Sequence, residues 1–284
     1  MTDQPLKTSL PAPFSFSQSS LQDYFDCNRR FQLRYVEQLH WPAVESAPVL
    51  ENERRQAEGQ LFHRMVQQYL IGLPEEKISS MAASSGSPDL ARWWDNFLEA
   101  GSTSLAGLGR ATSLHPEISL SAPFGKHRLV AKYDLITISD GRASIYDWKT
   151  YHNRPRDEWM KTRMQTRVYQ SLLVEAGAHL NGGQPFAPEQ VEMIYWYAEY
   201  PAEPARFTLT ARQFKREKEV LENLISEIAA RQSFPLTDDE QKCGYCPYRS
   251  YCERGVLAAE AEETGDITDA SWEVDLEQIQ EIEF

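Results

Sequence analysis

The spacing of apolar and polar residues along the chain predicts an α/β fold. Two amphipathic helices are expected first, over residues 17–39 and about 51–71, because apolar residues recur at helical spacing and Ser17 can cap the first of them. A loop is expected over residues 79–88, where small and polar residues dominate, and a short helix follows around residues 93–97. The elements expected between residues 17 and 97 are therefore all helices.

The pattern then changes to the two-residue period of strands. Three consecutive short strands are expected over residues 115–120, 127–139 and 142–149. Asp140-Gly141 falls between the last two, and Asp-Gly is a strong signal for a tight hairpin. The remaining expected elements are a basic helix over residues 157–176, strands at 191–198 and near 207, and a long helix over 211–231. A strand meander among helices predicts a central mixed sheet flanked by helices.

Composition fits a globular protein with a full core. The chain has 284 residues, of which 41% are hydrophobic and 11% aromatic. Its apolar runs are too short to span a bilayer, and the sequence does not open with a basic and then apolar leader. We therefore expect a cytoplasmic protein without a membrane partner. In that reducing compartment, metal binding is a better expectation for the four cysteines than disulfides.

The net charge of −13 argues at first against a nucleic-acid partner, but its distribution changes this conclusion. Residues 253–284 hold eleven acidic side chains and one basic one, which contribute −10. The rest of the chain has 31 acidic and 28 basic residues, so it carries only −3. A body this balanced can still present a basic cleft, because the local field matters more to DNA than the total charge.

Three charged residues are candidates for catalysis. Asp134 lies inside the strand expected at 127–139, and Asp147 and Lys149 end the next strand. A hairpin would set the two aspartates on neighbouring strands, with Asp147 and Lys149 on one side of theirs. Two carboxylates can hold Mg²⁺ or Mn²⁺, and the lysine can orient or polarise an attacking water. A salt-bridged edge of the sheet is the simpler alternative for Asp-x-Lys alone.

Five short motifs across residues 17–252 resemble, in order, the RecB-like branch of the PD-(D/E)XK nucleases, which includes the RecB and AddB nuclease domains and the CRISPR-associated RecB-like exonucleases. The motifs are Ser-x-Ser-x-Leu…Tyr…Cys at Ser17, Ser19 or Ser20, Leu21, Tyr24 and Cys27; Gly-x-x-x-His at Gly59 and His63; the acids and lysine at Asp134, Asp147 and Lys149; Gln-x-x-x-Tyr at Gln165 and Tyr169; and Cys-x2-Cys-x5-Cys at Cys243, Cys246 and Cys252. Tyr133 replaces the proline that the family name denotes, although this branch often lacks that proline, and Asn28 stands where many relatives have proline. The third motif uses Asp147, as relatives also do. None of these departures removes a group needed for chemistry.

The resemblance implies a role for each matching residue. It makes metal ligands of His63, Asp134, Asp147 and the carbonyl of Trp148, and it makes Lys149 the catalytic lysine. Gln165 and Tyr169 are four residues apart, so they would share a helix face directed at the scissile strand. Glu117 either contributes to the site or points outward from its strand, and the sequence does not choose between the two.

The activity implied by the resemblance is Mg²⁺- or Mn²⁺-dependent hydrolysis of DNA phosphodiesters. The expected mode is exonuclease action on single-stranded DNA or a free end, in DNA repair and recombination or in CRISPR adaptation. No Gly-x4-Gly-Lys-Ser/Thr motif occurs, so unwinding would need a helicase partner, and a CRISPR-adaptation protein is the other expected partner. The alternative from another class is a non-catalytic DNA-binding or scaffold module.

Four cysteines form a second constellation. Cys243, Cys246 and Cys252 lie within ten residues, whereas Cys27 is more than two hundred residues away. Four thiolates suit either Zn²⁺ or a [4Fe–4S] cluster, and the spacing does not choose between them. The resemblance implies the cluster, as an iron–sulfur staple that closes the α/β core by joining the first helix to the end of the domain. A zinc-stapled protein without a nucleic-acid role is the alternative.

Basic residues suggest where DNA would lie, with solvated helix surface as the alternative for each. The candidates are Arg29, Arg30 and Arg34 in the first helix and Arg154, Arg156, Lys161, Arg163 and Arg167 near Gln165. We expect a flexible N-terminus over residues 1–16, a nuclease domain over 17–252 and an acidic tail over 253–284. The tail is expected to be disordered, although it could also bind a partner or cover the DNA site.

Overall fold

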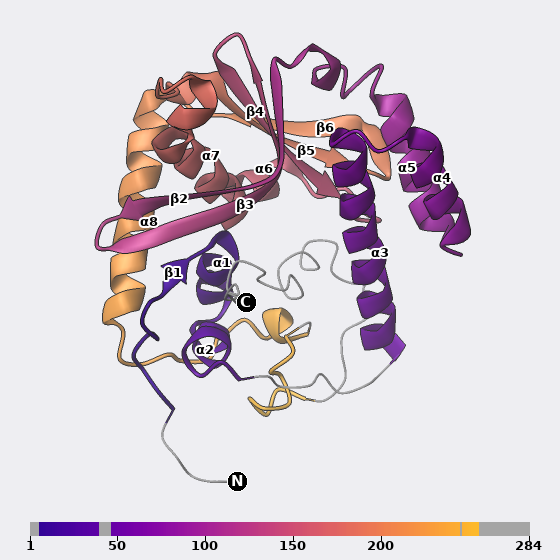
Figure 1. Cartoon of the computed structure of the whole chain (residues 1–284). Coiled ribbons are helices and arrows are strands. Elements are labelled where there is room, and N and C mark those ends of the chain that lie inside the picture. Colours follow the sequence, from indigo (N-terminus) through magenta and orange to yellow (C-terminus); the bar gives the residue numbers. More distant parts are fainter. Residues whose placement is uncertain (1–5, 40–46, 245, 256–284) are drawn as a thin grey trace, which may run out of the picture.

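The computed structural model describes residues 6–39, 47–244 and 246–255, and of residues 47–53 only the backbone. A six-stranded mixed sheet forms the centre of the molecule, and helices cover both of its faces (Figure 1). The expected α/β class is therefore confirmed. Within the described residues, no helix is long and apolar enough to cross a membrane.

The strands are β1 Ser15–Phe16, β2 Ser113–Phe124, β3 His127–Ser139, β4 Arg142–Lys149, β5 Val191–Tyr197 and β6 Tyr200–Thr208. Their order is β1-β3-β4-β5-β6, and β2 pairs with β3. The pairs β1–β3 and β4–β5 are parallel, and the others are antiparallel. Asp140 and Gly141 have φ of 50° and 72°, which is the left-handed backbone of a tight hairpin, so the expected turn is confirmed.

The helices are α1 Gln18–Asp26, α2 Asn28–Phe31, α3 Ala47–Leu70, α4 Glu75–Ser84, α5 Pro88–Ala100, α6 Asp157–Thr162, α7 Met164–Ala176 and α8 Ala211–Ala230. A π-helical turn, Gln32–Val36, continues α2. Short 3₁₀ turns occur at Leu108–Arg110, Gly177–Asn181, Pro188–Gln190 and Glu240–Cys243. The helices expected near residues 51–71, 93–97 and 211–231 are confirmed as α3, α5 and α8.

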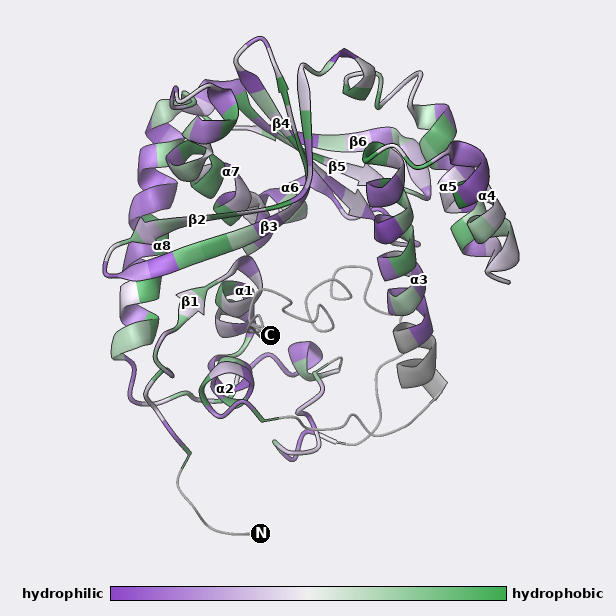
Figure 2. Ribbon diagram, in the orientation of Figure 1, coloured by the Kyte–Doolittle hydropathy of each residue, from purple (hydrophilic) through white to green (hydrophobic). Residues whose placement is uncertain are grey.

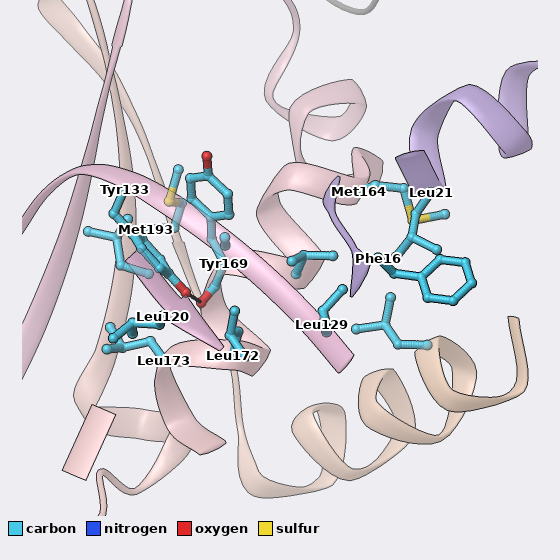
Figure 3. Packing of buried hydrophobic residues seen from close by; sticks show 14 of the residues in the cluster. Phe16, Leu21, Leu120, Leu129, Tyr133, Met164, Tyr169, Leu172, Leu173 and Met193 are labelled. Carbon is cyan, nitrogen blue, oxygen red and sulfur yellow. Dashed lines mark hydrogen bonds between the residues drawn. The ribbon is translucent and has the colours of Figure 1, made fainter. Parts of the chain in front are cut away.

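Two hydrophobic cores lie on opposite faces of the sheet. One packs α1, α7 and α8 against the sheet, and Figure 3 shows Phe16, Leu21 and Leu172 within it. The other packs α3, α4 and α5 around Trp148 and Trp196. In Figure 2, α8 mixes hydrophilic and hydrophobic residues, as expected for a helix with one face on a core and the other in solvent. Residues 15 and 16, at the end of the segment expected to be flexible, lie in the sheet.

The single helix expected over residues 17–39 is wrong, because the chain breaks at Cys27. This residue is extended, with φ of −158° and ψ of 113°, and it separates α1 from α2. The N–H of Arg29 donates to the carbonyl of Pro235, and its Nε donates to the carbonyl of Phe234, at 3.1 and 3.0 Å. Contacts with a segment two hundred residues away therefore replace the helical bonds that local sequence favours.

The helix expected over residues 157–176 is also divided. Arg163 is extended, with ψ of 145°, between α6 and α7. The N–H of Met164 donates to Oε1 of Gln22 in α1 at 3.1 Å, and the hydroxyl of Thr166 donates to the carbonyl of Met160 at 2.6 Å. A hydrogen bond from α1 thus fixes where α7 begins, and Gln165 lies in its first turn.

The loop expected over residues 79–88 is wrong for residues 79–84, which belong to α4. The serines of this segment favour turns, but Met81, Ala82 and Ala83 are good helix formers, and Ile78 and Ala82 are four apart and both buried in the α3–α5 core. The hydroxyl of Ser79 accepts a hydrogen bond from the indole of Trp94 at 2.9 Å. Packing of one helix face, together with the propensity of alanine and methionine, therefore outweighs the serines.

Candidate active site

The candidate site lies where β3 and β4 separate. Their pairing extends from the hairpin to Leu135 and Tyr146. Beyond this point the backbone N–H of Trp148 donates to Oδ2 of Asp134 at 2.9 Å instead. The carboxylate therefore bridges the diverging strands, which places it beside the end of β4.

Asp147, Lys149 and Gln165 form a closely hydrogen-bonded group. Lys149 Nζ lies 3.1 Å from Asp147 Oδ2, so the expectation that these two side chains share one side of β4 is confirmed. The ammonium donates to Oε1 of Gln165 at 3.0 Å, and Nε2 of that amide donates to Asp147 Oδ1 at 2.6 Å. All three side chains are buried, at 6% exposure or less. The amide thereby fixes both charged groups.

His63 reaches this region from α3. Its Nδ1 lies 3.2 Å from Asp134 Oδ1, and its Nε2 lies 2.8 Å from the carbonyl oxygen of Trp148. Gly59, one turn earlier, allows α3 to approach β4, because a Cβ at this position would come within 2.9 Å of Thr150 Oγ1. The Gly-x-x-x-His pattern thus combines a close helix–strand approach with a side chain directed at Asp134.

The charges of His63 and Asp134 stabilise each other. Burial alone would lower the pKa of His63, but the charge of Asp134 and its hydrogen bond outweigh burial and raise the pKa to about 9. Burial would raise the pKa of Asp134, but His63, the Trp148 N–H and Lys149 hold it below its ordinary value. Without a bound cation, the pair is therefore imidazolium and carboxylate at neutral pH.

Two tyrosine rings lie beside the ammonium of Lys149. Lys149 Nζ lies 5.5 Å from the ring centroids of both Tyr151 and Tyr195. The hydroxyl of Tyr195 is hydrogen-bonded to the hydroxyl of Thr166 at 2.8 Å, which fixes its ring. Cation–π attraction of this kind is strongest where water is excluded, so both rings stabilise this buried cation.

The donor set is suited to a hard divalent cation. Asp134 and Asp147 offer carboxylate oxygens, Trp148 a carbonyl oxygen and His63 an imidazole nitrogen. Among the residues that the structure describes, no three His, Cys, Asp or Glu side chains are already grouped as metal ligands. Each of these donors is now held by protein hydrogen bonds, which a cation would have to replace.

The four cysteines come from two segments that pack together. Leu33, in the π-helical turn, is in one buried cluster with Cys246 and Tyr248, and the Tyr248 hydroxyl donates to the carbonyl of Leu39 at 2.9 Å. None of the four is in a disulfide. Burial, together with the nearby charge of Cys27, raises the pKa of Cys246 to about 12 and that of Cys252 to about 11. The N-terminal cysteine is thus close enough to affect the C-terminal ones.

Tyr169 does not reach the group formed by Asp147, Lys149 and Gln165, which corrects the expectation for the Gln-x-x-x-Tyr pattern. Its hydroxyl donates to the backbone carbonyl of Lys132 in β3 at 2.7 Å, and it is 5% exposed. Figure 3 shows its ring beside Tyr133, with a centroid distance of 4.6 Å. Gln165 lies in the first turn of α7 and points at the site, whereas Tyr169, one turn later, faces β3.

Several basic residues expected to contact DNA are engaged within the protein. Arg30 is 4% exposed and pairs with Asp23 and Asp26, both at 2.8 Å, so it is not available to a phosphate. Four other arginines donate to protein groups: Arg34 to Asp23, Arg29 to the Phe234 carbonyl, Arg167 to Glu217 and Arg154 to Asp157. Arg163 stacks on Trp159, while Arg156 and Lys161 are exposed and stay predicted contacts.

Lys132 is a residue near the site that the motifs do not mark. It lies two positions before Asp134 in β3, and its side chain is 39% exposed. Tyr133, between them, is buried in the core formed with α1, α7 and α8, so Lys132 and Asp134 both point away from that core. The two-residue spacing from a candidate catalytic carboxylate is the signal that identifies it in the sequence.

One family model and two solved structures are similar to this chain. The sequence model described as the PD-(D/E)XK nuclease superfamily matches residues 15–253. Among solved structures, the chain is similar to a protein from Eubacterium rectale described as a candidate exonuclease, at 10% identity and a TM-score of 0.46, over 75% of this chain and 79% of that one. It is also similar to SSO0001, at 12% identity and a TM-score of 0.41, over 87% of this chain and 89% of that one. No curated protein sequence matches the chain.

Proposed function

The chain belongs to the PD-(D/E)XK nuclease superfamily, whose model spans residues 15–253, and we propose that it is a divalent-metal-dependent deoxyribonuclease. One observation carries the proposal. Asp134 contacts His63 and the backbone N–H of Trp148. Asp147 and Lys149 contact each other, and Gln165 is hydrogen-bonded to both. These residues come from two strands and two helices. A non-catalytic DNA-binding module would not need a buried lysine held between a carboxylate and an amide.

The proposed ligands of Mg²⁺ or Mn²⁺ are Asp134, Asp147, the imidazole of His63 and the carbonyl of Trp148. The donors fit because they are hard oxygens and an imidazole, and because the His63 ring contacts both the Asp134 carboxylate, at 3.2 Å, and the Trp148 oxygen, at 2.8 Å. His63 must lose its proton to act as a ligand, so metal uptake releases a proton. When bound, the cation lowers the pKa of water and offsets charge on the phosphate.

Lys149 is the proposed catalytic lysine. Its ammonium donates hydrogen bonds toward the attacking water and the developing charge on the phosphate oxygens, while Gln165 and Asp147 hold it in place. In the reaction, the water oxygen bonds to phosphorus, the bond from phosphorus to the leaving sugar oxygen breaks, and that oxygen takes a proton. Because the lysine is shielded from bulk water, its charge is poorly screened and acts strongly at short range.

The finer assignment is the RecB-like branch, with exonuclease action on single-stranded DNA or a free end. It rests on the order of the five motifs across residues 17–252. Repair and recombination, with a helicase partner, and CRISPR adaptation are both compatible with this proposal. We also propose residues 17–252 as the nuclease domain, between the N-terminal segment 1–16 and the acidic tail 253–284. The tail beyond residue 255 lies outside the described residues.

Incubation of the protein with 5′- or 3′-end-labelled single- and double-stranded DNA tests the proposal. With Mn²⁺ or Mg²⁺ we expect degradation, and with excess EDTA we expect none, because Asp134 and Asp147 alone cannot activate water. The order in which labelled products appear gives the polarity. In the matched control, Mg²⁺ is retained and EDTA is replaced by EGTA that is already saturated with Ca²⁺. Cleavage should then be intact, because this chelator leaves the Mg²⁺ in solution. An intact protein that binds DNA without cutting it would instead support the non-catalytic module.

We further propose that Cys27, Cys243, Cys246 and Cys252 hold a [4Fe–4S] cluster that joins α1 to the end of the domain. The set fits because burial, and after it the charge of the nearby Cys27, raises the pKa of Cys243, Cys246 and Cys252, so these three thiolates are disfavoured unless a cation compensates. The cluster would stabilise the fold, and it would take no part in cleavage.

Metal analysis of anaerobically purified protein tests this assignment. We expect about four iron atoms per chain and a brown colour, both lost in Cys246→Ser along with several degrees of thermal stability. One zinc ion per chain with no colour would replace the cluster by a zinc site. Cys246→Ala gives the same loss of a ligand without a new hydroxyl, and it should behave like the serine variant.

A further inference from the structure

Two residues that the sequence marks, Glu117 and Tyr169, both bind Lys132. The carboxylate of Glu117 in β2 lies 2.5 Å from Lys132 Nζ, and the hydroxyl of Tyr169 in α7 donates to the Lys132 carbonyl at 2.7 Å. A third residue, Tyr133, donates back from its hydroxyl to the carbonyl of Tyr169 at 3.0 Å (Figure 3). Both the backbone and the side chain of Lys132 are therefore fixed from neighbouring elements.

Glu117 has an unusual backbone for a strand residue. Its φ is 53°, in the left-handed region, although it lies inside β2 and is not glycine. The pairing of β2 with β3 includes Pro116–Leu135 and Ile118–Tyr133 and omits the position between them, which is opposite Asp134. Such strained residues persist where the surroundings hold them, and they are concentrated at functional sites. Here the local distortion coincides with the contact between Glu117 and Lys132.

We propose that Lys132 binds a phosphate of the DNA strand adjacent to the scissile phosphate. Glu117 and Tyr169 are its positioning residues. Lys132 and Asp134 are two apart in β3, so their Cα atoms lie about 7 Å apart and their side chains point away from the same core. The side chain is 39% exposed, unlike that of Lys149, so a phosphate in solvent can approach its ammonium. The proposal rests on the nuclease function of the neighbouring site.

DNA binding can be separated from cleavage in a Lys149→Met background, which we expect to be inactive. Anisotropy of a fluorescein-labelled single-stranded oligonucleotide, measured with Mn²⁺ over a range of KCl concentrations, gives the affinity and its salt dependence. We expect Lys132→Ala to weaken binding about 10-fold near 0.1 M salt and to reduce the slope of log affinity against log salt by about 1. Lys132→Arg should restore both values, because it keeps the charge.

Steady-state cleavage by otherwise wild-type enzyme gives the second readout. Lys132→Ala should raise KM about 10-fold with kcat within about twofold, as loss of ground-state binding requires. Tyr169→Phe, which keeps the ring and loses the hydrogen bond to Lys132, should shift KM in the same direction by less. Lys126→Ala is the matched control, since this exposed lysine lies roughly 20 Å away along the hairpin and should change neither value.

The outcomes distinguish this inference from the proposed nuclease function. A normal salt slope and KM in a folded Lys132→Ala protein would overturn the phosphate contact while leaving the nuclease intact. Loss of kcat at unchanged KM would also overturn it, because Lys132 would then act in the chemical step. If the wild type binds DNA but never cleaves it, a reduced salt slope still supports the contact, and only the proposed activity fails.

Discussion

Replacing Lys149 with alanine or methionine is expected to reduce the rate of DNA cleavage by roughly 10³-fold, while metal binding and folding persist. The lysine is the charged donor at the end of β4, and it is held by Asp147 at 3.1 Å and by Gln165 at 3.0 Å. Neither the amide nor the tyrosine rings beside it can supply a positive charge to the phosphate. Single-turnover cleavage of end-labelled DNA with Mn²⁺ measures the effect.

Two comparisons make this result specific to the chemistry. Mn²⁺ affinity, measured by calorimetry, should be equal or higher in the variants, because a positive charge next to Asp147 has been removed. Lys126→Ala, at the exposed tip of the β2–β3 hairpin, should cleave at the wild-type rate. Retention of wild-type activity by Lys149→Met would place the catalytic group elsewhere and leave the Asp147–Lys149 pair as a structural ion pair.

Arg30→Met is expected to destabilise the protein by about 3 kcal/mol, because it leaves the buried carboxylate of Asp23 with Arg34 in place of two arginine partners. Arg30 is 4% exposed and Asp23 is 1% exposed, and the same guanidinium also pairs with Asp26. Burial would lower the pKa of Arg30, but the two carboxylates outweigh burial and raise it, so the arginine is charged at every relevant pH. Urea unfolding followed by tryptophan fluorescence measures the free energy of unfolding.

The control for Arg30 is Lys161→Ala. Lys161 is an exposed cation on α6, so its removal should change the free energy of unfolding by no more than about 0.5 kcal/mol. If Arg30→Met were as stable as the wild type and bound DNA less tightly, Arg30 would be the surface phosphate contact that its sequence position suggests. The two readouts therefore separate a structural role from a DNA-binding role.

Helix breaks account for most of the difference between expectation and structure. Cys27 and Arg163 both lie inside segments whose apolar spacing predicts an uninterrupted helix, yet both are extended. In each case the chain is redirected by a hydrogen bond to a distant element, from Arg29 to Pro235 and from Met164 to Gln22. Hydrophobic periodicity records which face of a helix is buried, but it contains no information about such partners.

The same limit applies to the basic residues. The arginines of the first helix form a charge cluster in the sequence, and the acidic partners of Arg30, Asp23 and Asp26, lie only four to seven positions away. Whether these arginines face solvent or the interior depends on what packs over this region, where Cys246 and Tyr248 contact Leu33 in the π-helical turn after α2. A charge cluster alone therefore could not separate a DNA-binding surface from a buried ion-pair network.

The sequence by itself determined the α/β class, the hairpin at Asp140-Gly141 and the placing of Asp147 and Lys149 on one side of β4, because all of these follow from periods and turns spanning a few residues. The tertiary structure decided that His63 meets Asp134, that Gln165 rather than Tyr169 reaches Lys149, and that Lys132 is held beside the site. These contacts join residues 15 to 71 positions apart, or depend on backbone breaks set by distant hydrogen bonds. Their geometry is fixed by the packing of helices on the sheet, which local sequence patterns do not specify.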